Sequence, residues 1–286
     1  MADEDFTLID ARADGVAVVT LNRPDRRNAW SPELERAYFG ALERVDADPQ
    51  VRAIVVTGAG TTFCPGMDTA RLETIAGSRL SQDGRLPVYS PWRVRKPMIA
   101  AINGACAGIG LVQALLCDVR FIAARAKLST AFARRGLAGE YGLTWLLPRM
   151  VGLPVATELL LSARTVDAGE ALALGLVTRV VDPDELLTAA IAYAADLAAH
   201  CAPTSLAMLR HQLHLDGDAT FADAMRRSYH AMSSAVAGAD LAEGVASLLE
   251  KRAPSFPALP DDYDAAAILG DDVVITTQLP ETLLPD

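Results

Sequence analysis

A single carboxylate, Glu140, lies in an apolar stretch that is flanked by glycines, GLAGEYGLTWLLP at residues 136–148. A carboxylate held in apolar surroundings can take up and return a proton, which is the work of a general base. The alternative is that Glu140 only begins the helix that follows, where a negative charge is stabilised by the helix dipole. The residues of this stretch leave both interpretations open.

Two glycine-rich loops could supply a second element of a catalytic site. They read TGAGTTFCPGMD at 57–68 and INGACAGIGLVQALLCD at 102–118, and each follows an apolar run that is typical of a buried strand. Glycines let backbone amides approach a ligand closely, and a helix beginning near Gly108 would present further amides. The second loop has Gln113 where a dinucleotide-binding GxGxxG motif needs its last glycine, and the first lacks the Lys-Ser/Thr of a phosphate loop. A nucleotide cofactor is therefore disfavoured, and two amides converging on one oxyanion are favoured.

The other titratable residues have structural interpretations. Asp68 could be a base, but it follows PGM at an expected helix start, where capping the helix is the better explanation. Asp118 is expected to be structural at a helix end. The four histidines are expected on exposed helix surface, and with no cluster of acids or cysteines beside them no metal site is predicted: His200, His211, His214 and His230.

The elements that must position these residues change character along the chain. In the first half, short β-branched runs alternate with helical patterns, which predicts α/β units wound around one sheet or barrel. Ser31 and Pro32 are typical of a helix start, and Leu34 and Tyr38 begin its apolar face. The second half is mostly Ala- and Leu-rich helix. The predicted strands are 16–21, 51–57, 98–102, 119–123 and 176–181.

Composition limits the class of protein. The 286 residues are 51% hydrophobic, which supports a large buried core. The net charge of -10, from 26 basic and 36 acidic residues, argues against binding to nucleic acid. Four scattered cysteines without a CxxC pair suggest neither zinc nor disulfides, and no apolar run reaches the ~18 residues of a membrane span. A soluble, cytoplasmic protein with no membrane partner is expected.

Six motifs in order resemble those of one family: LNRPDRRNAWS at 21–31, VRAIVVTGAGTTFCPGMD at 51–68, KPMIAAINGACAGIGLVQALLCDVRFIA at 96–123, LPRMVG at 147–152, ALALGLVTRVV at 171–181 and EGVASLLEKRAPSF at 243–256. Over residues 6–256 the chain resembles the crotonase superfamily, the enoyl-CoA hydratase and isomerase family. The resemblance implies an α/β fold with a ββα spiral core over residues 1–198. It also implies a helical oligomerisation region at 199–256, which makes a homotrimer or a dimer of trimers, and leaves residues 257–286 as an acidic tail or strap.

The resemblance also implies a substrate and its contacts. The substrate is an acyl-CoA thioester, so coenzyme A enters as part of the substrate and no separate cofactor is expected. By position, the amides of Met67 and Ile109 form the oxyanion hole for the thioester carbonyl, in agreement with the two loops above. The expected substrate-binding residues are Arg26, Arg27, Ala29, Cys64, Gly66, Asp68 and Gly108.

The two acids of the family's hydratases are missing. Val112 stands where the first would be and Phe132 where the second would be. The surroundings of Glu140 instead resemble the segment that carries the single catalytic carboxylate of Δ3,Δ2-enoyl-CoA isomerases. The sequence therefore predicts an enoyl-CoA isomerase of fatty acid metabolism. A hydratase, which is a lyase, using Glu140 in an altered arrangement is one alternative, and a catalytically silent acyl-CoA-binding subunit is another.

Overall fold

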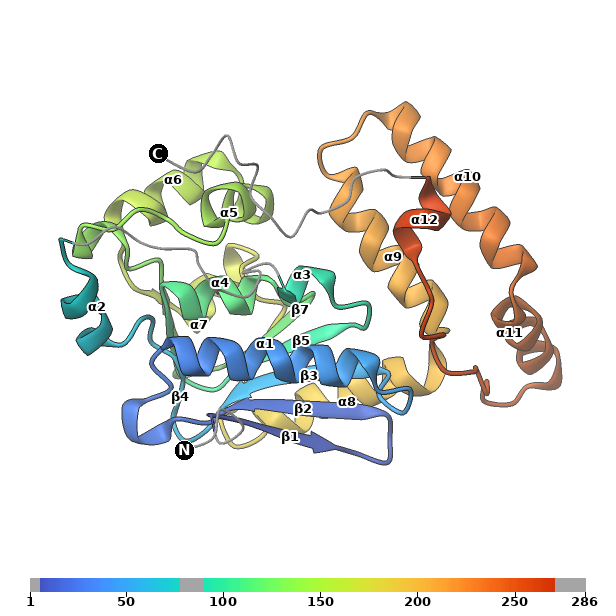
Figure 1. Cartoon of the computed structure of the whole chain (residues 1–286), viewed down its shortest axis with the longest axis horizontal. Helices are drawn as coiled ribbons and strands as arrows, with labels where there is room; N and C mark the ends of the chain where they lie inside the picture. Colours follow the sequence, from blue (N-terminus) through green and yellow to red (C-terminus); the bar gives the residue numbers. More distant parts are fainter. Residues whose placement is uncertain (1–5, 78–89, 271–286) are drawn as a thin grey trace.

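The computed structural model describes residues 6–77 and 90–270. Residues 271–286, the last sixteen of the predicted tail, lie outside these ranges. The sequence also predicts that residues 69–95 line the acyl pocket, and of these 78–89 lie outside the described ranges. In the part described, two sheets form the core of an α/β fold and the C-terminal helices project from it (Figure 1).

The larger sheet has six strands in the order β1-β2-β3-β5-β7-β10, of which β1 pairs antiparallel with β2 and the others pair in parallel. Its bounds are Thr7–Ala11, Val16–Leu21, Ala53–Gly58, Met98–Ile102, Val119–Ala123 and Arg179–Val181. All residues of β3 and β5 are buried, because helices cover both faces of the sheet. The predicted strands are confirmed, with two corrections. The strand predicted at 51–57 begins only at Ala53 and ends at Gly58. Leu176 and Val177 donate backbone hydrogen bonds to Ala171 at the end of α7, Ala168–Ala173, so the last strand begins only at Arg179.

The smaller sheet explains how the chain winds. Its strands are β4, Thr62–Cys64, β6, Ala105–Ala107, β8, Lys127–Ser129, and β9, Val166–Asp167. Strands β3, β5 and β7 of the large sheet are each followed by a short strand of the small one, and then by α2, α4 or a 3-10 turn. This repeated ββα unit is the spiral that the resemblance implied. It places successive loops next to one another, because β4 and β6 pair in parallel.

Helix α1, Pro32–Ala47, forms as the sequence predicted. The hydroxyl of Ser31 accepts a hydrogen bond from the Leu34 amide, and Pro32 occupies the first turn. Leu34 and Tyr38 are fully buried on the face that packs against β1 and β2. Helix α8, Leu186–His200, packs against β2, β3, β5 and β7. The remaining helices of the core are α2, Thr69–Ile75, α3, Ser90–Arg93, α4, Ile109–Leu115, α5, Leu143–Val151, and α6, Leu153–Ser162.

The C-terminal helices form a lobe beside the core (Figure 1). They are α9, Pro203–Asp216, α10, Phe221–Ala237, α11, Ala239–Glu250, and α12, Ala265–Leu269, with a small core around Met208, Ala231 and Leu269. Arg210 of α9 joins the lobe to the core through Asp118, 2.9 Å away, which agrees with the structural role predicted for that acid. After α11 the chain packs back on α9 of the same molecule, where the Tyr263 hydroxyl donates a hydrogen bond to the Thr204 carbonyl.

In residues 6–77 and 90–270, no single helix is long and apolar enough to cross a bilayer. Helices α8 and α9 meet the length and composition test only as a pair, which is bent by 114° at its break.

Candidate active site

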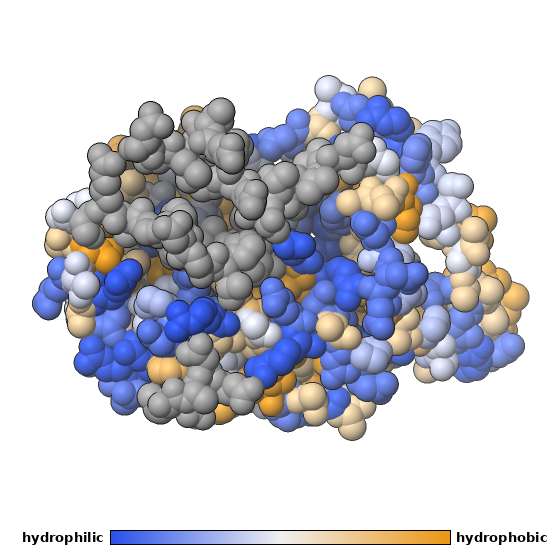
Figure 2. Space-filling model, viewed as in Figure 1, coloured by the Kyte–Doolittle hydropathy of each residue, from blue (hydrophilic) through white to orange (hydrophobic). Residues whose placement is uncertain are grey.

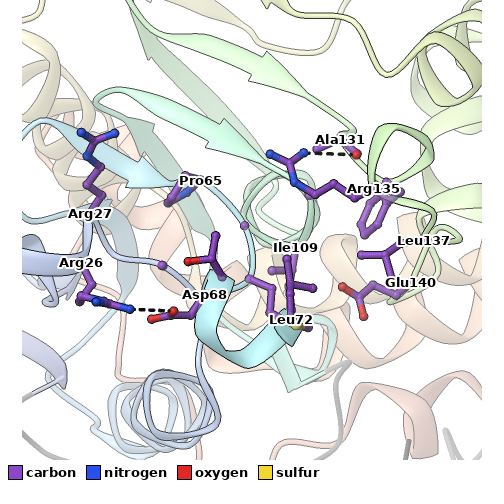
Figure 3. Close-up of a pocket in the computed structure, with 16 residues that line it drawn as sticks. Arg26, Arg27, Pro65, Asp68, Leu72, Ile109, Ala131, Arg135, Leu137 and Glu140 are labelled. Carbon is purple, nitrogen blue, oxygen red and sulfur yellow. Dashed lines mark hydrogen bonds and ion pairs between the residues drawn. The ribbon is translucent and has the colours of Figure 1, made fainter. Parts of the chain in front are cut away.

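The two glycine-rich loops and Glu140 meet at one pocket of about 370 Å³. Figure 3 shows Arg26 and Arg27 at one end of it, Arg135, Leu137 and Glu140 at the other, and Ile109 between them. The lining residues are Arg26, Arg27, Ala29, Pro65, Gly66, Met67, Asp68, Thr69, Leu72, Gly108, Ile109, Ala131, Phe132, Arg135, Leu137 and Glu140.

The first candidate oxyanion donor, the Met67 amide, belongs to a loop that is fixed by Trp30. The Trp30 amide donates to the Gly66 carbonyl at 2.8 Å, and the Asp68 amide donates to the Trp30 carbonyl at 2.9 Å. Successive peptide groups of an extended segment point in opposite directions. The Met67 amide, between these two bonds, therefore points away from Trp30.

The second candidate donor is the Ile109 amide, at the first residue of α4. The amides of the first helical turn have no acceptor within the helix. Gly108 precedes it with φ of +53°, and a Cβ on Gly108 would lie 3.7 Å from the Cα of Gly66. The two loops are thus in contact beside the pocket, as the sequence predicted. Gly110 allows the close packing, because a Cβ there would lie 2.2 Å from the Cys64 carbonyl oxygen.

Asp68 is committed to structure. Its carboxylate accepts from the Ala70 amide as the N-cap of α2, and it pairs with Arg23 at 2.8 Å and with Arg26 at 3.0 Å. The hydrogen bond from Arg26, together with those from Ala70 and Arg23, lowers the pKa of Asp68 against the opposing effect of burial. A carboxylate that is stabilised in its charged form is a poor base, so the capping interpretation is confirmed.

The turn that carries Arg26 and Arg27 is fixed to the loop at residues 59–62 by the side chain of Asn28. This residue is fully buried, and its amide nitrogen donates to the carbonyls of Ala59 and Thr62. Arg27 and Asn28 both have left-handed backbone, with φ of 56° and 60°. The turn presents two guanidinium groups at one end of the pocket, where they suit a phosphate-bearing ligand.

Glu140 does not begin a helix. Helix α5 starts at Leu143, its N-cap is Gly142, no side chain caps it, and no acid lies in its first turn. The backbone carbonyl of Glu140 accepts a hydrogen bond from the Leu143 amide, while its side chain lines the pocket. The interpretation of Glu140 as a favourable charge at a helix start is therefore wrong.

The apolar surroundings expected for Glu140 are only partly those observed. Leu137 lines the pocket, whereas Leu143 is fully buried in the core and Trp145 packs edge to face on Trp92, with ring centroids 5.6 Å apart. Leu72 and Phe132 supply apolar lining instead.

The pocket includes every predicted site residue except Cys64. That side chain is fully buried under α4, and burial raises the pKa of its thiol to about 12. Sequence reasoning had not selected Pro65, Thr69, Leu72 and Ala131. Pro65 lies within the predicted loop 57–68, and Thr69 and Leu72 lie in α2 directly after it, so their position in or next to that loop was the available signal.

The histidines differ from expectation in two cases. His200 and His230 are exposed, as predicted. His211 is only partly exposed and its Nε2 atom is buried, and His214 stacks on Trp92 with ring centroids 3.9 Å apart, so the prediction of exposed surface is wrong for these two residues. Burial, helped by Arg210 and His211, lowers the pKa of His214 to about 3. In the part of the chain that the structure describes, no group of three or more His, Cys, Asp or Glu side chains could hold a metal ion.

Comparison with known proteins assigns the chain to a family. The model of the family described as "Enoyl-CoA hydratase/isomerase" matches residues 11–258. The chain belongs to the enoyl-CoA hydratase/isomerase family. A putative enoyl-CoA hydratase of Thermus thermophilus is 35% identical over 255 residues, which cover 87% of this chain and 100% of the relative. The (E)-benzylidenesuccinyl-CoA hydratase of Thauera aromatica is 37% identical, over 84% of this chain and 95% of the relative.

A solved structure agrees. That of a probable enoyl-CoA hydratase/isomerase from Mycobacterium abscessus has a TM-score of 0.82 and 33% identity, and the match covers 88% of this chain and 99% of the other. The crotonase resemblance and the fold that it implied are thus confirmed. The protein is an enzyme of this family, whose members include hydratases and isomerases.

Proposed function

We propose that the enzyme is a Δ3,Δ2-enoyl-CoA isomerase in which Glu140 is the single proton carrier. The observation that carries the proposal is the distribution of carboxylates in the pocket. Among its described lining residues the two acids are Asp68 and Glu140, and Asp68 is bound to two arginines and to a helix end. The positions that carry the acids of the family's hydratases hold Val112, fully buried in α4, and Phe132.

The chemistry needs one base and one oxyanion site. The Glu140 carboxylate removes a proton from C2 of a 3-enoyl thioester, and the C–H electron pair delocalises into a dienolate whose negative charge is largely on the thioester oxygen. The amides of Met67 and Ile109 stabilise that oxygen, a contribution on the order of 3 kcal/mol per donor in other enzymes. Glu140 then returns the proton to C4 and leaves the double bond between C2 and C3. Coenzyme A takes part only as the carrier of the acyl group, with Arg26 and Arg27 beside its phosphates.

The test is turnover of 3-enoyl-CoA and of 2-enoyl-CoA by the wild type and by Glu140→Gln. We expect isomerisation to fall by at least ~100-fold in the variant, as is typical of the loss of a general base. Binding of a saturated acyl-CoA should be unchanged, because the two amides and the arginines are untouched. Glu43→Gln, an exposed acid of α1, is the matched control and should keep full activity.

A hydratase is the second candidate, since relatives from Thermus thermophilus and Thauera aromatica carry that name. The wild type would then add water to 2-enoyl-CoA without isomerising 3-enoyl-CoA. That result, or full isomerase activity in Glu140→Gln, would contradict the proposal.

We further propose that the enzyme assembles as a trimer or a dimer of trimers through its C-terminal lobe. The apolar positions of α10 could pack in the core of the chain or against another subunit. Phe221 and Met232 are 82% and 64% exposed, and Leu248 and Leu249 of α11 are 76% and 77% exposed. Figure 2 shows apolar residues at the surface of this lobe. Exposed apolar area of this extent is typical of an interface.

A further inference from the structure

A buried carboxylate outside the pocket connects the two halves of the site. Glu35 is only 4% exposed, on the face of α1 that packs against the core. A buried charge is costly unless hydrogen bonds compensate it. Its Oε2 atom accepts two: one from Nε1 of Trp30 at 3.0 Å and one from Oη of Tyr141 at 2.6 Å. We call these three side chains the Glu35 network.

Through Trp30 the network reaches the oxyanion loop. The Trp30 ring is buried and packs edge to face on Tyr38, with centroids 5.8 Å apart. Its backbone forms the two hydrogen bonds that hold Gly66 and Asp68 on either side of Met67. Trp30 therefore contacts Glu35 through its side chain and the segment around Met67 through its backbone.

Through Tyr141 the network reaches Glu140. Tyr141 directly follows Glu140 and has φ of +53°, and Gly142 has φ of +73°. Left-handed backbone is unfavourable for a bulky residue and persists only where its surroundings enforce it. The short hydrogen bond from Tyr141 to Glu35 is such a restraint, and the turn it maintains directs the Glu140 side chain to the pocket.

We infer that Glu35 is a positioning residue that sets the separation between the Met67 amide and the Glu140 carboxylate. It does not line the pocket and touches no substrate. Two donors that share one oxygen atom are held at a fixed distance from each other, although Trp30 and Tyr141 are more than a hundred residues apart in sequence. The inference rests on the proposed function, since it concerns the base and the oxyanion donor of that reaction.

The decisive variant is Tyr141→Phe, which removes one hydroxyl from the network. We expect kcat for 3-enoyl-CoA to fall at least ~10-fold with KM within ~3-fold, because misplacing a catalytic group by about 1 Å costs up to ~100-fold. Tyr38→Phe is the matched control. It removes a buried phenol one turn from Glu35, and its hydroxyl has no hydrogen-bond partner within the described part of the chain. Its kcat should equal that of the wild type.

A double variant separates positioning from general stability. If Tyr141 acts through Glu140, adding Tyr141→Phe to Glu140→Gln should not lower the residual turnover further. Glu35→Gln, which keeps an acceptor oxygen, should retain more kcat than Glu35→Leu, which keeps none. Equal kcat in Tyr141→Phe and Tyr38→Phe would overturn the inference, as would a full additional loss in the Glu140→Gln background.

Failure of the proposed function would be recognised separately. If the wild type turns over neither 3-enoyl-CoA nor 2-enoyl-CoA, that proposal fails and kinetics no longer report on Glu35. Urea unfolding of Glu35→Gln, Tyr141→Phe and the double variant then decides. We expect their effects on the folding equilibrium to be coupled by about threefold or more. Coupling below that value would show that the network does not hold the Glu140 segment.

Discussion

The substitution Asp68→Asn tests how the loop that carries Met67 is held in place. Asparagine has nearly the same shape and keeps one oxygen that can cap α2, so the change removes the charge and replaces the oxygen that accepts from Arg23 with an amide donor. The bond to Arg23 is 2.8 Å long, and the side chains of Arg23 and Asp68 are 19% and 6% exposed. A hydrogen bond to a charged group in such a site contributes roughly 1.5 to 3 kcal/mol. The pair with Arg26, whose side chain is 48% exposed, adds little because solvent screens it.

We therefore expect the free energy of unfolding at pH 7 to be about 2 kcal/mol lower in Asp68→Asn than in the wild type. The pH dependence has a definite sign. Because the arginines lower the pKa of Asp68 in the folded state, its stabilising effect is complete above the unfolded pKa, roughly 3.9, and is lost as pH falls through the folded pKa. The difference between the two proteins should be constant above about pH 5 and should narrow below about pH 4.

Urea unfolding followed by circular dichroism from pH 7 to pH 3 measures this difference. Asp167→Asn is the matched control, because the exposed Asp167 caps α7 in the same way, through the Glu170 amide. It should cost less than about 0.5 kcal/mol. A difference for Asp68→Asn that stays at 2 kcal/mol down to pH 3 would refute the electrostatic explanation, and a difference no larger than that of Asp167→Asn would refute the anchoring role.

Two further predictions concern the second loop and the assembly. Gly110→Ala should lower the free energy of unfolding by at least about 2 kcal/mol and should also reduce turnover. The reason is that the new methyl group would lie 2.2 Å from the Cys64 carbonyl oxygen and must displace the start of α4. An unchanged melting temperature and an unchanged kcat would refute this prediction. Light scattering at micromolar protein concentration should give a mass of three or six times the 30.3 kDa chain. The double variant Phe221→Lys, Met232→Lys should have a lower mass. A wild-type mass near that of one chain would contradict the proposed assembly.

Much of the fold and the main chain of the site could be predicted because their signals are local. Runs of β-branched residues predict the strands. Ser31 and Pro32 predict the start of α1, because helix capping involves only residues of the first turn. The approach of Gly66 to Gly108 followed from two glycine loops on parallel strands. The same local reasoning correctly made Asp68 a helix cap.

The rest depends on contacts between distant segments. The burial of Glu35 could not be predicted, because only one of its two partners, Trp30, is close in sequence and the other, Tyr141, comes from 106 positions further along the chain. The arginine partners of Asp68 lie 42 and 45 residues before it. The prediction for His214 was wrong for the same reason. The residues of its own helix do not indicate burial, because the ring that covers it belongs to Trp92, from another segment of the chain.

Backbone amides and side chains have different roles in the proposed mechanism, which explains how one fold can support more than one reaction of enoyl thioesters. In the proposed mechanism the Met67 and Ile109 amides stabilise the thioester oxygen, whose negative charge is common to proton transfer and to addition of water. What differs is which side chains can hold a proton or a water molecule nearby. Here Phe132 puts an apolar ring, 5% exposed, against the pocket, and Val112 contributes no polar atom. A water molecule needs two to four polar partners to be held in place. Because Asp68 is paired with two arginines, the proposed mechanism assigns the proton transfer to Glu140, and it moves that proton within the substrate instead of adding water.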